Sequence, residues 1–272
     1  MDGSGVGAAR VAPLDGERLR AALVGPLGPW TDIRVSAETG STNSDVLRLA
    51  QLGAPAGLVI ATERQNSGRG RQGRAWGSIP YAALTFSVLL RPAGVPPALR
   101  GWVTLLAGLA ASTAVRERTA VDASLKWPND VMVGDRKLAG ILAEQSGDAI
   151  VVGIGLNVLG QAKDLPVPTA TSLEREGVTA DRTDLLIAIL RELAGQYQRW
   201  SGTAHGDPQA SGLRPAYLAH CGTIGRQVRV MLPGDAALTG IAADIDGTGR
   251  LVVASGGSEP VAVSAGDVIH VR

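Results

Sequence analysis

The sequence predicts an α+β protein, in which a mixed β-sheet domain is followed by a small all-β barrel. Strand-like and helix-like segments intermingle up to about residue 222, and an amphipathic helix is expected late in this stretch. After Gly225 the chain changes to short β-like runs separated by glycine and aspartate turns. With 272 residues, 45% of them hydrophobic, the chain is long enough for one sizeable core and a small second domain.

The larger domain, residues 31–222, is expected to follow a loose segment over 1–30 that contains one short helix at 15–24. Ser41-Thr42-Asn43-Ser44 then precedes apolar residues at helical spacing, which predicts a capped helix ending near Gly53. Compact or alternating apolar runs rich in strand formers complete the sheet, and they lie at residues 57–62, 82–90, 124–127, 138–144 and 149–158.

Two longer helices are expected in the same domain. Residues 99–118 are apolar on most faces, and the longest apolar stretch within them, 101–115, is shorter than the ~20 residues that a membrane span needs, so a buried core helix is predicted. Apolar residues at intervals of three and four between Leu185 and Trp200 predict an amphipathic helix, opened near Asp181 or Thr183.

The second domain, residues 223–272, is expected to be a small β-barrel. Turns at Pro233-Gly234-Asp235 and at 246–249 separate its short runs. The expected strands occupy residues 227–231, 238–243, 251–254, 260–263 and 268–271.

Composition excludes several classes of function. The formal net charge of +1 provides no global field to attract nucleic acid or an anionic membrane. One cysteine, Cys221, excludes an internal disulfide, and the three histidines show no metal-ligand spacing. The N-terminus begins without the basic region and apolar core of a signal peptide. We therefore expect a cytoplasmic protein that does not bind membranes.

The most informative segment is the loop Gly68-Arg69-Gly70-Arg71-Gln72-Gly73-Arg74-Ala75-Trp76. Its glycines let the backbone approach a ligand closely, and its three guanidiniums favour a polyphosphate or a carboxylate. A solvated basic loop or a nucleic-acid contact is the alternative. A Walker phosphate loop is excluded, because no Gly-Lys-Ser/Thr follows.

Lysines are rare, since only Lys126, Lys137 and Lys163 occur among 26 basic residues. A compact ammonium can bridge two anions, as a carboxylate attacking a phosphate requires, so Lys137 is a candidate catalytic group; a solvated lysine at a strand end is the alternative. Lys126-Trp127-Pro128-Asn129-Asp130 combines an aromatic, a rigid proline and two oxygen-bearing side chains, although a strand-ending turn would explain it equally.

Gly153-Ile154-Gly155-Leu156-Asn157 places two glycines on one face of a predicted strand. A flat ligand could lie there against bare backbone, with Asn157 available to hydrogen-bond it. A tight contact between sheet and helix would explain the same glycines.

Taken in order, these segments resemble the biotin protein ligase family. Its hallmarks are the Gly-Arg loop, Lys-Trp-Pro-Asn-Asp, Lys-Leu-Ala-Gly-Ile-Leu and Gly-Ile-Gly-x-Asn, and all four occur here across residues 68–157. Ser41-Thr42-Asn43 and Ala265-Gly266-Asp267-Val268 extend the match to both ends of the chain. The resemblance implies a catalytic domain like those of class II aminoacyl-tRNA synthetases and a C-terminal SH3-like β-barrel.

The resemblance also implies the reaction. Biotin and ATP would form biotinoyl-5′-AMP, with Mg²⁺ carried by ATP, and the biotinoyl group would pass to a lysine of a carboxylase's biotin carboxyl carrier domain. The loop over residues 65–78 should be mobile without ligand and ordered over it.

Roles for individual residues follow from the same resemblance. The biotin site would comprise Ser41, Thr42, Asn43, Gln65, Gly68, Arg69, Gly70, Arg71, Lys137, Gly140 and Gly155. ATP and the adenylate would contact Arg69, Arg71, Arg74, Trp76, Asn129, Lys137 and Asn157, with Trp76 and Asn157 against the adenine. Lys137, Arg69 and Arg71 would be catalytic, and Asp130 would assist either the acceptor lysine or Mg²⁺, a choice left open.

Two rival functions remain. A lipoate-protein ligase would share the fold and the adenylate chemistry, and a nucleic-acid-binding module could use Arg69, Arg71 and Arg74. About 30 residues precede the catalytic segment, too few for a winged helix domain, so direct DNA binding is not expected. A weak homodimer through the central sheet is left open.

Overall fold

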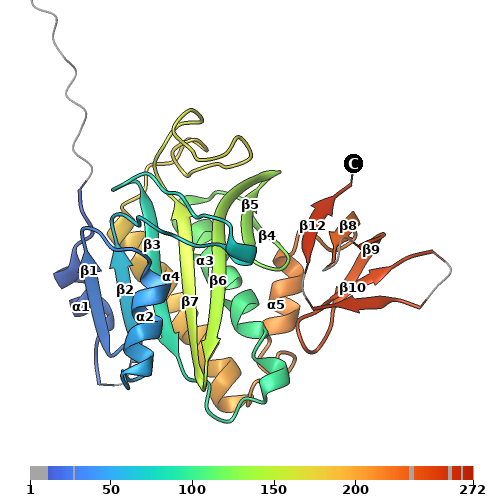
Figure 1. Cartoon of the computed structure of the whole chain (residues 1–272), viewed down its shortest axis with the longest axis horizontal. Coiled ribbons are helices and arrows are strands. Elements are labelled where there is room, and N and C mark those ends of the chain that lie inside the picture. Colours follow the sequence, from blue (N-terminus) through green and yellow to red (C-terminus); the bar gives the residue numbers. More distant parts are fainter. Residues whose placement is uncertain (1–11, 27, 233–235, 257–258, 265, 272) are drawn as a thin grey trace, which may run out of the picture.

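The computed structural model describes residues 12–26, 28–232, 236–256, 259–264 and 266–271. Its largest element is a seven-stranded sheet with the order β1-β2-β3-β7-β6-β5-β4 (Figure 1). β1 and β2 run parallel and the remaining neighbours are antiparallel, so the predicted mixed sheet is confirmed. Its strands are β1 (Asp32–Ser36), β2 (Leu58–Thr62), β3 (Ala83–Leu90), β4 (Ala123–Lys126), β5 (Asp130–Val133), β6 (Arg136–Ser146) and β7 (Ala149–Asn157).

Helices cover both faces of this sheet. On one face lie α3 (Trp102–Thr119), α4 (Arg182–Gln198) and the short α1 (Gly16–Leu23), and on the other lies α2 (Thr42–Gln51) (Figure 1). The Asp181 side chain accepts from the Asp184 amide and caps α4, which settles the two starts proposed for that helix. Ser41 caps α2 and Asp15 caps α1 in the same way.

Side-chain alternation along the strands divides the apolar residues between two layers. Leu84, Phe86 and Val88 of β3 belong to the main core under α3 and α4, whereas Leu89 belongs to a smaller cluster under α2. The same period places Thr85 and Ser87 of β3, Gly153 and Gly155 of β7, and Gly140, Leu142 and Glu144 of β6 on the α2 face. Polar and glycine residues therefore replace the apolar core on one half of this face.

The long apolar helix is a core element. Residues 97–119 satisfy the length and composition of a membrane span, but two thirds of the most apolar window is buried inside the protein. Trp102, Leu106 and Ala110 of α3 are almost completely inaccessible. The sequence-based prediction of a buried helix is confirmed.

The C-terminal part forms a separate antiparallel sheet of five strands in the order β11-β10-β9-β8-β12. Its strands agree closely with the predicted runs: β8 (Gln227–Met231), β9 (Ala237–Ile245), β10 (Leu251–Ala254), β11 (Val261–Val263) and β12 (Asp267–His270). The predicted closed barrel is not confirmed, because within the described ranges the edge strands β11 and β12 do not pair with each other. The expected turn at 233–235 and Ala265 lie outside the described residues.

Indole and hydroxyl groups join the two parts of the chain. The Trp102 Nε1–H donates to the Gly247 carbonyl at 2.9 Å, and the Trp127 Nε1–H donates to the Gly249 carbonyl at 3.0 Å. The Trp127 amide donates to Thr223 Oγ1, which also contacts His270 Nε2 of β12 at 3.2 Å. Helix α5 (Leu213–His220) leads into this junction.

Candidate active site

The polar half of the α2 face forms the floor of a cavity of about 170 Å³, closed on its outer side by the Gly-Arg loop. The cavity brings together fourteen of the sequence-predicted site residues: Ser41, Thr42, Asn43, Gln65, Arg69, Gly70, Arg71, Arg74, Trp76, Asn129, Asp130, Lys137, Gly140 and Gly155. These residues come from the start of α2, the loop over 65–76 and the strands β5, β6 and β7, with Asn129 directly before β5.

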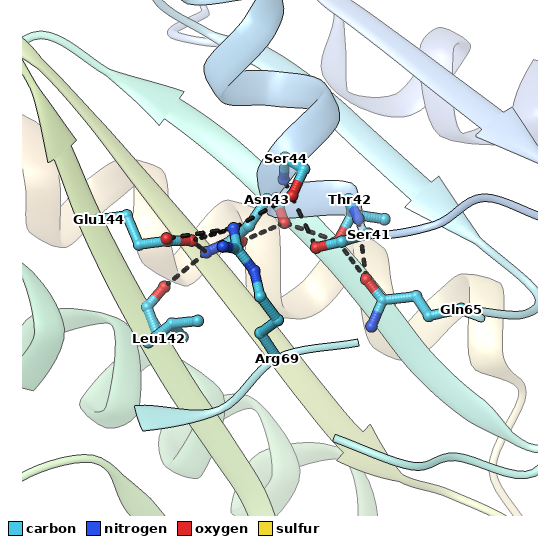
Figure 2. A network of polar contacts seen from close by, with 9 residues as sticks. Ser41, Thr42, Asn43, Ser44, Gln65, Arg69, Leu142 and Glu144 are labelled. Carbon is cyan, nitrogen blue, oxygen red and sulfur yellow. Dashed lines mark hydrogen bonds and ion pairs between the residues drawn. The ribbon is translucent and has the colours of Figure 1, made fainter. Parts of the chain in front are cut away.

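The N-terminus of α2 supplies a polar cluster at one end of the cavity (Figure 2). The Thr42 amide and hydroxyl both donate to Gln65 Oε1, at 2.8 and 3.1 Å. Ser87 of β3 contacts Thr42 Oγ1 at 2.7 Å and Asn43 Oδ1 at 2.6 Å. Because Thr42, Asn43 and Ser87 are almost completely buried, their orientations are fixed before any ligand arrives.

Trp76 lies flat against Gly155, one of the two glycines that the sequence marks as bare backbone, and against Gly140 of β6. A Cβ atom on Gly155 would fall 2.3 Å from Trp76 Cε2, and one on Gly140 would fall 3.1 Å from Trp76 Cζ3. The buried Trp76 Nε1 has no hydrogen-bond partner among the described residues. At Gly155 the loop's own indole occupies the bare strand surface, whereas Gly153 makes the tight contact between sheet and helix that was the alternative, because a Cβ atom there would fall 2.2 Å from Asn43 Oδ1 of α2.

Lys137 is held in the cavity by both its backbone and its side chain. Its Nζ lies 2.6 Å from Asp130 Oδ1, without hydrogen-bond alignment, and 5.7 Å from the centre of the Trp76 ring. Its amide donates to the Thr169 carbonyl, and its own carbonyl accepts from the Thr171 amide, each at 2.8 Å. These contacts exclude the alternative of a freely solvated strand-end lysine.

The three arginines of the loop reach three different parts of the protein. Arg69 donates to Ser44 and Glu144, Arg71 donates to Asn129 Oδ1 at 2.9 Å, and Arg74 pairs with Asp267 of β12. Burial lowers the pKa of the half-buried Arg71 guanidinium, against the opposing attraction of Asp267 and Asp130, yet the group remains charged at neutral pH. The loop is pinned over the cavity at three separate points.

Two predicted site residues do not line the cavity. Asn157 is buried, and its Nδ2 donates to the Thr171 carbonyl at 3.0 Å, so it holds the segment after β7 in place of contacting the cavity. Gly68 lies behind the Gln65 side chain, where a Cβ atom would fall 2.5 Å from the Trp76 carbonyl oxygen. The structure gives both residues a supporting position.

Conversely, several lining residues were not predicted. They are Ala75, Thr85, Phe86, Ile141, Leu142, Gly153, Ile154 and Asp267. Gly153 stands within the predicted glycine motif, and a Cβ there would fall 2.2 Å from Asn43 Oδ1, so the motif itself carried that signal. Asp267 comes from the C-terminal sheet, and local sequence contains no sign that it meets the loop.

Comparison with known proteins agrees with this geometry. The model of the biotin/lipoate A/B protein ligase family matches residues 35–159, and that of the biotin protein ligase C terminal domain matches residues 223–271. A structure of biotin protein ligase from Aquifex aeolicus in complex with biotin and ATP superposes with a TM-score of 0.74 at 27% identity, covering 89% of this chain and 100% of that one.

Curated relatives extend the similarity over nearly the whole chain. A biotin–[acetyl-CoA-carboxylase] ligase of Mycobacterium tuberculosis is 45% identical over 265 residues, which are 96% of this chain and 97% of that protein. The corresponding enzyme of Paracoccus denitrificans is 35% identical over 80% of this chain and 92% of its own length. Fold and site together define a ligase of the biotin and lipoate type. Within that class, the chain belongs to the biotin protein ligase family.

Proposed function

We propose that this chain is an ATP-dependent biotin protein ligase that modifies a biotin carboxyl carrier domain of a carboxylase. The observation that carries the proposal is the meeting of Lys137 and Arg71 with the polar cluster of Thr42 and Gln65 in one cavity. The cations suit the carboxylate and phosphates, and the polar cluster suits the ureido group of biotin.

The chemistry proceeds in two steps. A carboxylate oxygen of biotin attacks the α-phosphorus of ATP, the bond to the bridging oxygen breaks, and pyrophosphate leaves. Two anions must approach, and at ~4 Å two like charges repel by about 4 kcal/mol at an effective dielectric of ~20, so Lys137 and Arg71 supply the required compensation. The acceptor lysine then attacks the carbonyl carbon and AMP leaves.

Mg²⁺ would enter with ATP and shield the phosphate charge. The cavity offers two oxygen-bearing side chains for it, Asp130 and Asn129, which are engaged here with Lys137 and Arg71. Within the described part of the chain, no three His, Cys, Asp or Glu side chains gather as a ligand set. We therefore assign the ion to the nucleotide and give these two residues a supporting part.

The domain organisation is proposed on the same basis. A segment over 1–30, a catalytic domain over 31–222 and an SH3-like domain over 223–272 are supported by the second family match, which begins at residue 223. The cytoplasmic location, the absence of direct DNA binding and a weak homodimer stay predictions.

The test is exchange of labelled pyrophosphate into ATP by the purified chain, with biotin, lipoate or octanoate and without acceptor protein. Exchange with biotin alone is the expected result. Exchange only with lipoate would keep the adenylate chemistry and change the substrate. Silence with all three acids, together with salt-sensitive retention of nucleic acid on a filter, would favour the binding-module alternative.

A further inference from the structure

Glu144 is a charged residue beside the cavity to which the reaction gives no role. It stands on β6, on the α2 face, and its side chain is 27% exposed. Two groups from different elements converge on its carboxylate (Figure 2): Asn43 from the first turn of α2, and Arg69 from the Gly-Arg loop. It is thus a direct link between the rigid floor of the cavity and its loop cover.

The contact with Asn43 fixes the orientation of a buried amide. Asn43 Nδ2 donates to Glu144 Oε2 at 2.7 Å and to the Leu142 carbonyl at 3.3 Å, while its Oδ1 contacts Ser87 Oγ at 2.6 Å. An ionised carboxylate only accepts hydrogen bonds, so it holds the NH₂ end of the amide toward β6 and the oxygen end toward Ser87. The same hydroxyl contacts Thr42, which donates to Gln65.

The contact with Arg69 fastens the loop. Arg69 NH2 lies 3.2 and 3.3 Å from the two carboxylate oxygens and 3.1 Å from Ser44 Oγ at the start of α2. Arg69 is 47% exposed, so this ion pair is weak and can open and close readily. A weak, reversible contact is what a loop that must admit and release ligand requires.

We infer that Glu144 is a positioning residue that performs both tasks: it orients the Asn43, Ser87 and Thr42 groups beneath biotin, and it fastens Arg69 over the bound adenylate. The inference rests on the proposed function for its ligand, but the two contacts exist in the chain without ligand. A variant that removes only the carboxylate charge should therefore differ in its effects from a variant that removes the whole side chain.

Two variants resolve the tasks. In Glu144→Gln the amide oxygen still accepts from Asn43, while its NH₂ faces Arg69 and offers no acceptor there. We expect biotin affinity close to that of the parent chain and adenylate release that is roughly two- to fivefold faster. Glu144→Ala removes both contacts, so the biotin Kd should also rise roughly two- to tenfold.

The readouts are biotin titration by calorimetry and release of preformed labelled adenylate on a filter. Because the effect on release acts through Arg69, adding Glu144→Gln to Arg69→Ala should not accelerate release further. The control is Asp148→Asn, which removes an exposed charge at the β6–β7 turn that pairs with Arg91 away from the cavity. It should change neither quantity.

The outcomes separate this inference from the proposed function. Parent-like affinity and release in Glu144→Ala, or additive acceleration in the double variant, would overturn the role of Glu144 while leaving the enzyme assignment intact. If the parent chain makes no adenylate, amide hydrogen exchange still tests whether Glu144 fastens the loop. Residues 68–70 of the ligand-free Glu144→Gln chain should exchange faster than in the parent chain. Equal exchange rates would refute the contact between Glu144 and the loop as a fastening.

Discussion

At the scale of single residues, Lys137 is the group to which we assign the main part in the first half-reaction. Lys137→Ala is expected to abolish biotin-dependent pyrophosphate exchange, because the wide planar guanidinium of Arg71 cannot replace a compact cation between the two reacting anions. Stability should fall by less than about 1 kcal/mol, since the side chain is one third exposed and makes few core contacts. Exchange assays and urea unfolding check both parts. Lys163→Ala is the control, because that lysine is exposed on the segment after β7.

The position of the Trp76 indole depends on the absence of a side chain at Gly155. Gly155→Ala would place a methyl group 2.3 to 2.5 Å from three atoms of the indole, which must therefore move. We expect faster hydrogen exchange in the loop around Trp76 and at least a tenfold loss of biotin affinity, because the methyl also narrows the ligand surface. Gly202→Ala meets no atom within 4 Å and should leave both properties unchanged. Unaltered loop exchange in Gly155→Ala would show that the indole does not rest there in solution.

How far sequence predicts a site is visible in individual residues. Thr42 and Lys137 stand in recognisable motifs, Gln65 was named through the family resemblance, and the cavity contains all three. Glu144 and Asp267 could not be found this way, because each acts through a partner far along the chain, Arg69 and Arg74 respectively. Asn157 was predicted from its motif but does not line the cavity, because its side-chain amide donates to the Thr171 carbonyl.

At the scale of elements, the Gly-Arg loop is the part whose position depends on contacts with the C-terminal sheet. Arg74 pairs with Asp267, and Arg71 NH2 also lies 3.4 Å from the Gly266 carbonyl. Asp267→Asn is expected to loosen the loop and to speed adenylate release roughly two- to fivefold, because an exposed ion pair contributes up to about 1 kcal/mol. The release assay and loop hydrogen exchange should change together; faster release with unchanged loop exchange would contradict the assignment.

Elements with a clear apolar pattern were predictable, short strands among them, and elements without such a pattern were not. The runs that became β2, β3, β7 and α4 each carry several apolar residues in one period. β1, β5 and α5 escaped prediction. The two strands have five and four residues, each with charged or polar members, and α5 contains Pro215 within its first turn. Strand order was also beyond reach, because pairing between distant strands leaves no local pattern.

At the scale of the whole molecule, the junction between the two sheets makes stability depend on pH. Burial, together with repulsion from Lys126 and Arg226, lowers the pKa of His270 to about 4 from the usual 6.5. Between these values the unfolded chain binds more protons than the folded chain, so stability is lost as the pH falls through this window.

We expect His270→Gln to reduce the loss of unfolding free energy between pH 7 and pH 4.5 by about 1 kcal/mol, allowing for screening of a half-buried ring. Denaturant unfolding of both chains at a series of pH values measures the difference. An identical pH dependence of the unfolding free energy in the two chains would show that His270 does not contribute to it. The sequence could not have indicated this histidine, because its environment is formed by residues from both parts of the chain.

The placement of Trp76 against Gly155 and Gly140 also has a kinetic consequence. If biotin binds against these two glycines, as the family resemblance implies, it meets in the free chain a surface that is already occupied by an indole of the same protein. Because the Trp76 ring must leave before biotin can bind, biotin cannot increase the rate at which the ring leaves. The observed association rate should therefore level off at high biotin concentration, at a plateau equal to the rate at which the ring swings out. The affinity of this enzyme would then be limited by its own competing side chain as well as by the contacts it makes with the vitamin.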